Sequence, residues 1–188
     1  MNEGHMQFCT SEDWRQILEN DILPDALGRV ALGARVIEVG PGPGFTTDVL
    51  LRSASHVTAV EIDPVLARQL RDRLGDANVD VVVGDARRTG LPDGSFTGAA
   101  SFNMFHHIPT DDDQDGVFAE LARLLAPGGV MVVTDGFDSE EVRLFHEGDT
   151  YNPIRPDTLP ARLGAAGFVD VDVTAHELGW ICTAAVPA

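Results

Sequence analysis

The stretch that decides the fold of this chain is Val36-Ile37-Glu38-Val39-Gly40-Pro41-Gly42-Pro43-Gly44. An apolar run that enters a cluster of glycines is typical of a buried parallel strand followed by a tight turn. Glycine has no Cβ atom, so a backbone with glycine at three alternate positions can pass close to a ligand. We therefore expect a strand at 35–39, a helix from about Phe45, and a ligand at the carboxyl end of the strand. By itself, the loop is also compatible with a tight turn that binds nothing.

Strands and helices alternate along the chain after this loop, which predicts a parallel sheet with helices on both faces. The last third differs, because two short strands there are close enough in sequence to form an antiparallel pair. Before the loop, residues 11–32 are expected to be helical, with a break or kink at Pro24. Later strands are expected at 56–62, 79–83, 96–102, 130–134, 168–174 and 178–185, and later helices from Pro64 and at 117–125 and 159–166.

A length of 188 residues favours a single domain. Residues 1–34 are expected to form an N-terminal helical cap, and residues 35–135 the core that carries the glycine loop. Residues 136–160 are rich in glycine and proline and resemble a lid-like insertion. Residues 161–188 complete the domain with a helix and the strand pair.

The charge and cysteine content exclude several kinds of partner. The chain has 30 acidic and 13 basic residues and a net charge of −17, so it is expected to repel nucleic acid. Cys9 and Cys182 lie near opposite ends and form no redox or metal motif, which is typical of a reducing compartment. We find neither a signal peptide nor an apolar run long enough to cross a bilayer. We therefore expect a cytoplasmic protein without a membrane partner, either a monomer or a homodimer.

A second feature of the ligand site is Glu61, which ends the second strand 21 residues after Gly40. An acidic residue at about this spacing can accept hydrogen bonds from both hydroxyls of a ribose. Alternatively, Glu61 or Asp63 only caps the helix that begins at Pro64, and Asp63 fits that role better. A nicotinamide cofactor is disfavoured, because its G-x-G-x-x-G loop requires a third glycine where this chain has Phe45.

Five segments resemble, in order, the motifs of class I S-adenosylmethionine-dependent methyltransferases, and together they span residues 35–135. The resemblance implies a Rossmann-like, doubly wound α/β fold with a mostly parallel seven-stranded sheet and a C-terminal antiparallel strand pair. The chain departs from the family at Thr97-Gly98, where Phe-Asp is common, so the geometry of the fourth strand is open. The five segments are VIEVGPGPGFTTDVL, VTAVEIDP, VVVGDARRTGLPDGSF, FNMFHHIP and LARLLAPGGVMVVTD.

The resemblance also implies roles for individual residues around S-adenosylmethionine. The glycine loop wraps the methionine part of the cofactor, and Glu38 lies near its ammonium group, directly or through water. Glu61 holds the ribose hydroxyls, Ile62 packs on adenine, and Asp85 accepts a hydrogen bond from the adenine amino group. The backbone at Ala86 meets the ring, and Asn103 lines the methionine end. The full set is Glu38, Gly40, Pro41, Gly42, Gly44, Glu61, Ile62, Asp85, Ala86 and Asn103.

The acceptor side carries several candidate bases and no motif for a metal. His107 is the first candidate for a catalytic base, because it follows the segment at Asn103. We expect no metal site, because the adjacent side chains of His106 and His107 should point apart in an extended segment. For Phe8 and Trp14, ordinary core packing is an interpretation that is at least equally good. The residues expected around the acceptor are His5, Phe8, Trp14, His106, Phe137, His146 and Tyr151.

These observations predict methyl transfer from S-adenosylmethionine to a small-molecule acceptor, with S-adenosylhomocysteine as product. One alternative is an rRNA adenine methyltransferase, which the run VTAVEIDPVLARQL resembles. Those enzymes carry Asn-Leu-Pro-Tyr or a close relative after the fourth strand, whereas this chain has Asn103-Met104-Phe105-His106. The other alternative is a protein that binds the cofactor without catalysing transfer.

Overall fold

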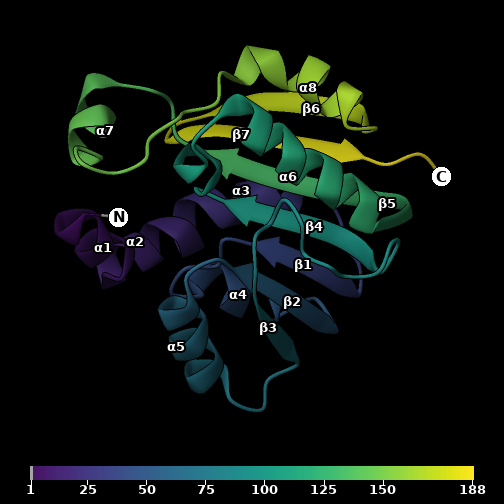
Figure 1. Ribbon diagram of the computed structural model, residues 1–188, viewed down its shortest axis with the longest axis horizontal. Coiled ribbons are helices and arrows are strands. Elements are labelled where there is room, and N and C mark those ends of the chain that lie inside the picture. The colour runs from purple at the N-terminus through teal and green to yellow at the C-terminus, as the bar shows by residue number, and fades with distance from the viewer. Residues whose placement is uncertain (1) are drawn as a thin grey trace.

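A computed structural model describes residues 2–188 and shows a seven-stranded sheet with helices on both faces (Figure 1). The strand order is β3-β2-β1-β4-β5-β7-β6, in which the first five strands are parallel and β7 runs antiparallel to both β5 and β6. This confirms the predicted fold class. The strands are β1 Arg35–Val39, β2 His56–Glu61, β3 Val79–Val83, β4 Phe96–Phe102, β5 Leu125–Asp135, β6 Val169–His176 and β7 Gly179–Ala185.

Two hydrophobic clusters hold the helices against the sheet. Alternate residues of β1 point to opposite faces, so Val36 belongs to one cluster and Ile37 to the other. The Ile37 face is covered by α6 and α8, and the Val36 face by η1, α3 and α4. The helices are α1 Glu3–Cys9, α2 Glu12–Ile17, α3 Leu23–Gly28, α4 Phe45–Leu50, α5 Pro64–Leu74, α6 Asp111–Leu124, α7 Glu140–Phe145 and α8 Leu159–Ala165, with a π-helical turn η1 Leu18–Ile22 and 3₁₀ turns η2 Phe105–His107 and η3 Pro156–Thr158.

Local capping explains where α5 and α6 begin. The Asp63 carboxylate accepts hydrogen bonds from the amides of Val65 and Leu66, which confirms the predicted cap of α5. The Thr110 side chain caps α6 in the same way, so α6 begins several residues before the predicted range 117–125. Its first turn carries three aspartates, which suit the positive end of a helix but leave no apolar pattern in the sequence.

The N-terminal region is more helical than expected. Helix α1 was not predicted, and the helical region 11–32 is divided into α2, η1 and α3. The distortion lies at η1, directly before Pro24 in the first turn of α3, so the predicted interruption at this proline is confirmed.

The departure at Thr97-Gly98 has a packing reason. The Thr97 hydroxyl donates to the backbone oxygen of Leu32 at 2.8 Å and accepts from the Arg35 amide at 3.0 Å. A Cβ atom on Gly98 would lie only 2.7 Å from the Leu32 Cα atom. The chain that enters β1 therefore passes directly over β4, which keeps its predicted span, with a register irregularity between Phe96 and Gly98.

Helices α1, α2 and α7 lie together beyond one end of the sheet (Figure 1), and we call these three helices the cover. Aromatic contacts join them, with the ring centroids of Phe8 and Phe145 5.6 Å apart and those of Phe8 and Trp14 5.4 Å apart. The Asn2 side chain also donates to the backbone oxygen of Phe145 at 3.0 Å. Across residues 2–188, we find no helix with the length and hydrophobicity to cross a membrane.

Candidate functional site

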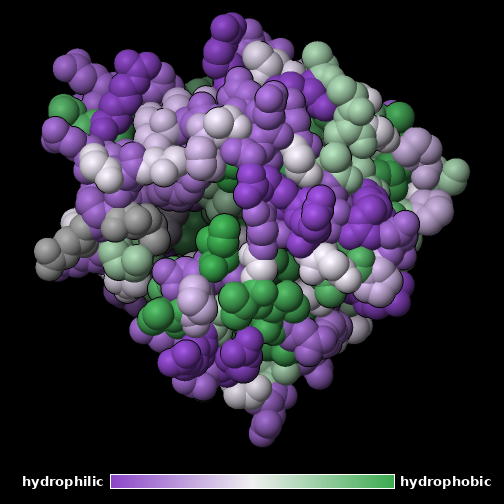
Figure 2. Space-filling model, in the orientation of Figure 1, coloured by the Kyte–Doolittle hydropathy of each residue, from purple (hydrophilic) through white to green (hydrophobic). Residues whose placement is uncertain are grey.

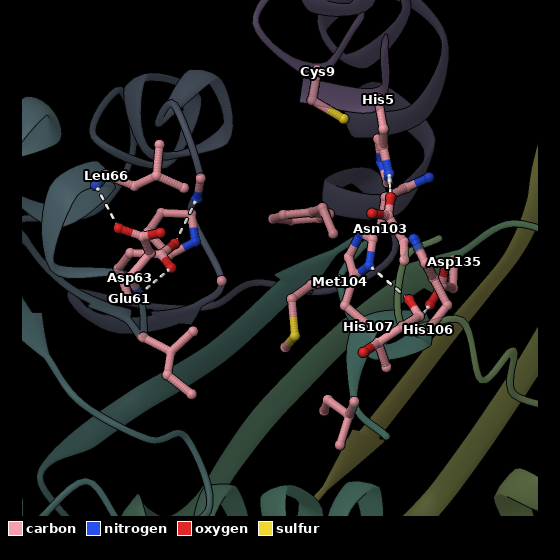
Figure 3. A pocket seen from close by; sticks show the side chains of 18 of the residues that line it. His5, Cys9, Glu61, Asp63, Leu66, Asn103, Met104, His106, His107 and Asp135 are labelled. Atoms are coloured by element: carbon pink, nitrogen blue, oxygen red, sulfur yellow. Dashed lines mark hydrogen bonds and ion pairs between the residues drawn. The ribbon is translucent and has the colours of Figure 1, made fainter. Parts of the chain in front are cut away.

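A cavity of about 600 Å³ lies between the cover and the ends of the central strands. Figure 2 shows this face of the molecule hollowed beside the cover, with apolar residues at the rim. Figure 3 shows Glu61 and Asp63 at one end of the cavity, His5, His106 and His107 at the other, and Met104 between them. Its volume is typical of small-molecule sites. The predicted residues that line it are Gly40, Pro41, Gly42, Glu61, Ile62, Asp85, Ala86 and Asn103 and, on the acceptor side, His5, Phe8, Trp14, His106, His107, His146 and Tyr151.

The glycine loop forms one wall of the cavity. Gly40 has φ +70°, and a Cβ atom there would overlap the Met104 side chain. Its amide donates to the Val60 backbone oxygen, which ties the loop to β2. Gly44 has φ +84° and precedes α4, but it does not line the cavity. The glycine loop therefore follows β1 as predicted. Gly40 and Gly42 line the cavity, whereas Gly44 lies behind its wall at the start of α4.

Glu61 joins two loops at the cavity wall. One carboxylate oxygen accepts from the Gly42 amide at 3.1 Å, and the other accepts from the Asp63 amide at 2.9 Å. The residue is 5% exposed and lines the cavity. Because each carboxylate oxygen has more than one acceptor site, both can still accept hydrogen bonds from a ligand. Glu61 is therefore fixed in position by the protein before any ligand binds.

Glu38 lies behind the loop and does not line the cavity. Its carboxylate accepts hydrogen bonds from the hydroxyls of Thr46 and Thr47, the second at 2.6 Å. Complete burial raises the pKa of Glu38 to about 7, although both hydroxyls act in the opposite direction. Thr46 does line the cavity. A ligand group would therefore contact Glu38 through the Thr46 hydroxyl or a water molecule.

The predicted adenine residues lie beside Glu61. Ile62 is 70% exposed and lines the cavity, so its side chain offers an apolar surface on which a ring can pack. The Asp85 carboxylate also lines the cavity, but it accepts hydrogen bonds from the Arg87 guanidinium and amide. The hydrogen bond from the Arg87 side chain is the main reason why the pKa of Asp85 is lowered. Asp85 is therefore an anionic acceptor held by its neighbour.

The segment after β4 crosses the middle of the cavity. Asn103 has φ +51°, a left-handed conformation that asparagine tolerates better than most residues. Its amide donates to the Thr134 backbone oxygen at 2.9 Å, and the Thr134 hydroxyl donates to its side-chain oxygen at 3.1 Å. This conformation presents the next residue, Met104, to the cavity. We did not predict Met104, although it lies in the family segment FNMFHHIP.

Four histidines meet at the end of the cavity under the cover. Ring centroids of His106 and His107 lie 4.1 Å apart, and those of His5 and His146 lie 4.4 Å apart. The prediction that His106 and His107 point apart is therefore wrong. It assumed an extended segment, whereas both residues lie in the tight turn η2.

Each histidine uses its Nδ1 atom within the protein. His5 Nδ1 lies 2.8 Å from an Asp149 carboxylate oxygen, and His106 Nδ1 lies 2.5 Å from Asp135. Backbone oxygens face the other two rings, with Thr150 at 3.4 Å from His107 Nδ1 and Val142 at 2.7 Å from His146 Nδ1. Burial lowers the pKa of His107 to about 3, so this ring is neutral at pH 7 and a weak base.

Of the remaining residues predicted around the acceptor, Tyr151 lines the cavity and Phe137 does not. The Tyr151 ring stacks on His146 at 4.5 Å between centroids, and burial raises the pKa of its hydroxyl to about 12. Phe137 is 44% exposed and does not line the cavity, so its predicted place in the acceptor pocket is wrong. The other lining residues were not predicted individually, and the fold brings them together from separate segments. They include Met6, Cys9, Ile108, Asp135, Asp149 and Leu178.

Residues 37–133 match a family described as the methyltransferase domain, over just more than half of the chain. A probable ribosomal RNA small subunit methyltransferase A of Methanothermobacter thermautotrophicus is 52% identical over 59 residues, 31% of this chain and 22% of that protein. An uncharacterized methyltransferase of Mycobacterium tuberculosis is 32% identical over 123 residues, 65% of this chain and 60% of that protein. The chain thus covers less than two thirds of either relative.

A solved structure has the same fold. The structure of an S-adenosylmethionine-dependent methyltransferase from Aquifex aeolicus matches with a TM-score of 0.77 and 17% sequence identity. The match covers 99% of each chain. The cover and the C-terminal strand pair therefore belong to an arrangement that a solved protein shares.

Proposed function

Because the chain belongs to the methyltransferase domain family, as its motifs predicted, we propose that it transfers a methyl group from S-adenosylmethionine to a small-molecule acceptor. The observation that carries this proposal is the position of Glu61. It lines the cavity at the end of β2 and is held there by the Gly42 and Asp63 amides. A carboxylate fixed in this way can accept from two vicinal hydroxyls of a ribose.

The cofactor would extend from Ile62 to Asn103 along the cavity. Glu61 would hold the ribose, while Ile62 supports the adenine and Asp85 and Ala86 meet its polar edge. The glycine loop would leave room for the methionine part, because side chains at its glycines would enter that space. We propose that the Thr46 hydroxyl accepts a hydrogen bond from the ammonium group while it donates one to Glu38. The positive charge of the ammonium group would then favour the carboxylate form of Glu38.

The protein's main contribution to transfer is alignment. Bound S-adenosylmethionine supplies a methyl group already activated by a sulfonium. Holding the acceptor in line behind that methyl can lower the barrier by about 7–11 kcal/mol in favourable cases. Aromatic rings of the cover also line one end of the cavity and would limit the access of water to the reacting groups.

Burial of the histidine end favours a small acceptor over a nucleic acid. His5 is 3% exposed and His146 6% exposed, so a large substrate would have to displace the cover. Phe105 is completely buried and stacks on Phe118, so it cannot stack on a target base. The net charge of −17 also opposes RNA binding.

An rRNA methyltransferase remains the second candidate because of the 52% identity over 59 residues. This match covers 31% of this chain and 22% of that relative, so the similarity is limited to a short stretch. Assays with a metabolite panel and with ribosomal RNA, using S-adenosylmethionine labelled in the methyl group, separate the candidates. Label on a metabolite alone supports our proposal, and label on RNA alone contradicts it. Cofactor binding without label on either would indicate a binding protein.

We predict that His107→Ala lowers turnover at least about tenfold while the affinity for S-adenosylhomocysteine changes little. His107 lines the acceptor end of the cavity and, as a weak base, is expected to position the acceptor and not to remove its proton. Turnover is measured with the acceptor that the panel identifies, and affinity by calorimetry. His56→Ala is the control, because His56 pairs with Asp80 outside the cavity. Unchanged turnover in His107→Ala would remove this residue from the site.

We also predict that cofactor affinity falls as the pH drops below 7. Glu38 has a pKa of about 7 and is mostly protonated below it, whereas a bound ammonium group favours the carboxylate. Binding then releases a proton, and affinity falls by up to about tenfold for each pH unit below 7. Calorimetry with S-adenosylhomocysteine at several pH values measures this slope. Glu38→Gln should flatten it, and an equal slope in both proteins would contradict the role of Glu38.

A further inference from the structure

Four histidines from three separate segments bring their ring nitrogens together at the covered end of the cavity. His5 comes from α1, His106 and His107 from η2, and His146 directly follows α7. One nitrogen from each ring lies within 4.8 Å of the other three. The helices of the cover thus place two of these rings against the two that follow β4.

Each of the four rings uses its Nδ1 atom within the protein, which leaves the Nε2 atom available on each. All four Nδ1 atoms face a carboxylate or a backbone oxygen of the protein, as described above. A ring that donates from Nδ1 presents an unprotonated Nε2 atom with a lone pair. Metal-binding histidines in proteins show this same arrangement, in which an outer carboxylate or carbonyl fixes the tautomer.

Burial makes this arrangement costly unless something binds to it. His106 Nε2 and His146 Nε2 are buried and, among residues 2–188, find no hydrogen-bond partner. His106 is 9% exposed and His146 6% exposed. A buried polar atom without a partner typically costs about 1–3 kcal/mol. Two such atoms in one cluster therefore indicate a ligand that accepts electron pairs.

We propose that the Nε2 atoms of His5, His106, His107 and His146 bind one divalent transition-metal ion, with zinc as the first choice. Imidazole is a good ligand for zinc, copper, nickel and iron, whereas calcium and magnesium require oxygen ligands. Tetrahedral zinc with bonds of about 2.0–2.1 Å places its ligand atoms about 3.4 Å apart. One nitrogen from each ring already lies within 4.8 Å of the other three, so the rings must move closer together to reach this geometry.

The surroundings also suit a cation. Asp135 and Asp149 hold two of the rings and contribute negative charge behind them. The metal would lie at the acceptor end of the cavity, where an oxygen or nitrogen of the acceptor could bind only as a fifth ligand. That last step rests on the proposed function, whereas metal binding itself does not.

Metal titration of the protein without cofactor or acceptor tests the proposal. The protein is prepared without a histidine tag, treated with a chelator, dialysed, and titrated with zinc chloride by calorimetry. We expect one ion per chain with a dissociation constant of about 1 μM or below. The melting temperature should rise with zinc, because the metal binds only the folded state. The absence of binding at about 100 μM zinc would overturn the proposal.

Variants locate the ion. His106→Gln and His146→Gln should each weaken zinc binding at least about 100-fold, and Asp149→Asn about 10- to 100-fold through the His5 ring. His56→Gln is the matched control and should bind zinc as the unaltered protein does. Cobalt provides a second readout, because its visible absorption reports the geometry of its ligands. Unchanged affinity in His106→Gln and His146→Gln, with both variants folded by circular dichroism, would place the ion elsewhere. A failed zinc titration with intact, Glu61-dependent cofactor binding would refute this inference alone.

Discussion

Glu61→Ala is expected to weaken binding of S-adenosylmethionine and S-adenosylhomocysteine by at least about 100-fold. Hydrogen bonds to a charged group contribute about 1.5–3 kcal/mol each, and the ribose would lose two of them. The same change leaves the Gly42 and Asp63 amides without their carboxylate acceptor, so the glycine loop loses one hydrogen bond to the end of β2 and keeps the one from Gly40 to Val60. Calorimetry with both ligands measures the loss directly.

Two controls make this result specific. Glu12→Ala removes a carboxylate that is 66% exposed in the first turn of α2 and does not line the cavity, so affinity should stay unchanged. Titration with NAD tests the competing cofactor class and should show no binding to either protein. If Glu61→Ala bound S-adenosylhomocysteine within about threefold of the unaltered protein, our assignment of the ribose site would be wrong.

Gly98→Ala is expected to lower the free energy of unfolding by about 3 kcal/mol or more. The added Cβ atom would lie 2.6 Å from Leu32 Cβ and 2.7 Å from Leu32 Cα. Most of this contact is with backbone, so a change of side-chain rotamer cannot relieve it, and overpacking of a core typically costs about 1–3 kcal/mol or more. For a chain of this size, a loss of 3 kcal/mol lowers the melting temperature by about 6–12 °C.

Gly116→Ala is the matched control for this substitution. Gly116 lies within α6, where an added Cβ atom would meet only the Arg87 side chain at 3.6 Å or more. Alanine is better than glycine inside a helix by up to about 1 kcal/mol, so stability should be equal or slightly higher. Equal stability of Gly98→Ala and Gly116→Ala in urea denaturation would contradict the close crossing over β4.

The sequence by itself determined the sheet and the end of the cavity at Gly40 and Glu61, where we propose that the cofactor binds. Strands appear as local runs of apolar residues, and β3 and β4 begin and end where the pattern predicts. The carboxyl ends of parallel strands must meet at one edge, so the end of β1 and the end of β2 bring Gly40 and Glu61 together without any further information. Helix α6 began earlier than predicted because a polar, capped first turn carries no apolar pattern.

Only the tertiary structure decided the acceptor end. His5 lies 101 residues before His106 and His146 lies 40 residues after it, and no local pattern shows that the cover brings them together. The conformation of η2 brings the His106 and His107 rings side by side, whereas an extended segment would separate them. The need for glycine at position 98 likewise becomes clear only from the structure, in which Leu32 passes directly over β4. Local physics fixes where the strands lie, although β5 begins five residues earlier than predicted, whereas contacts between distant segments depend on how the whole chain packs.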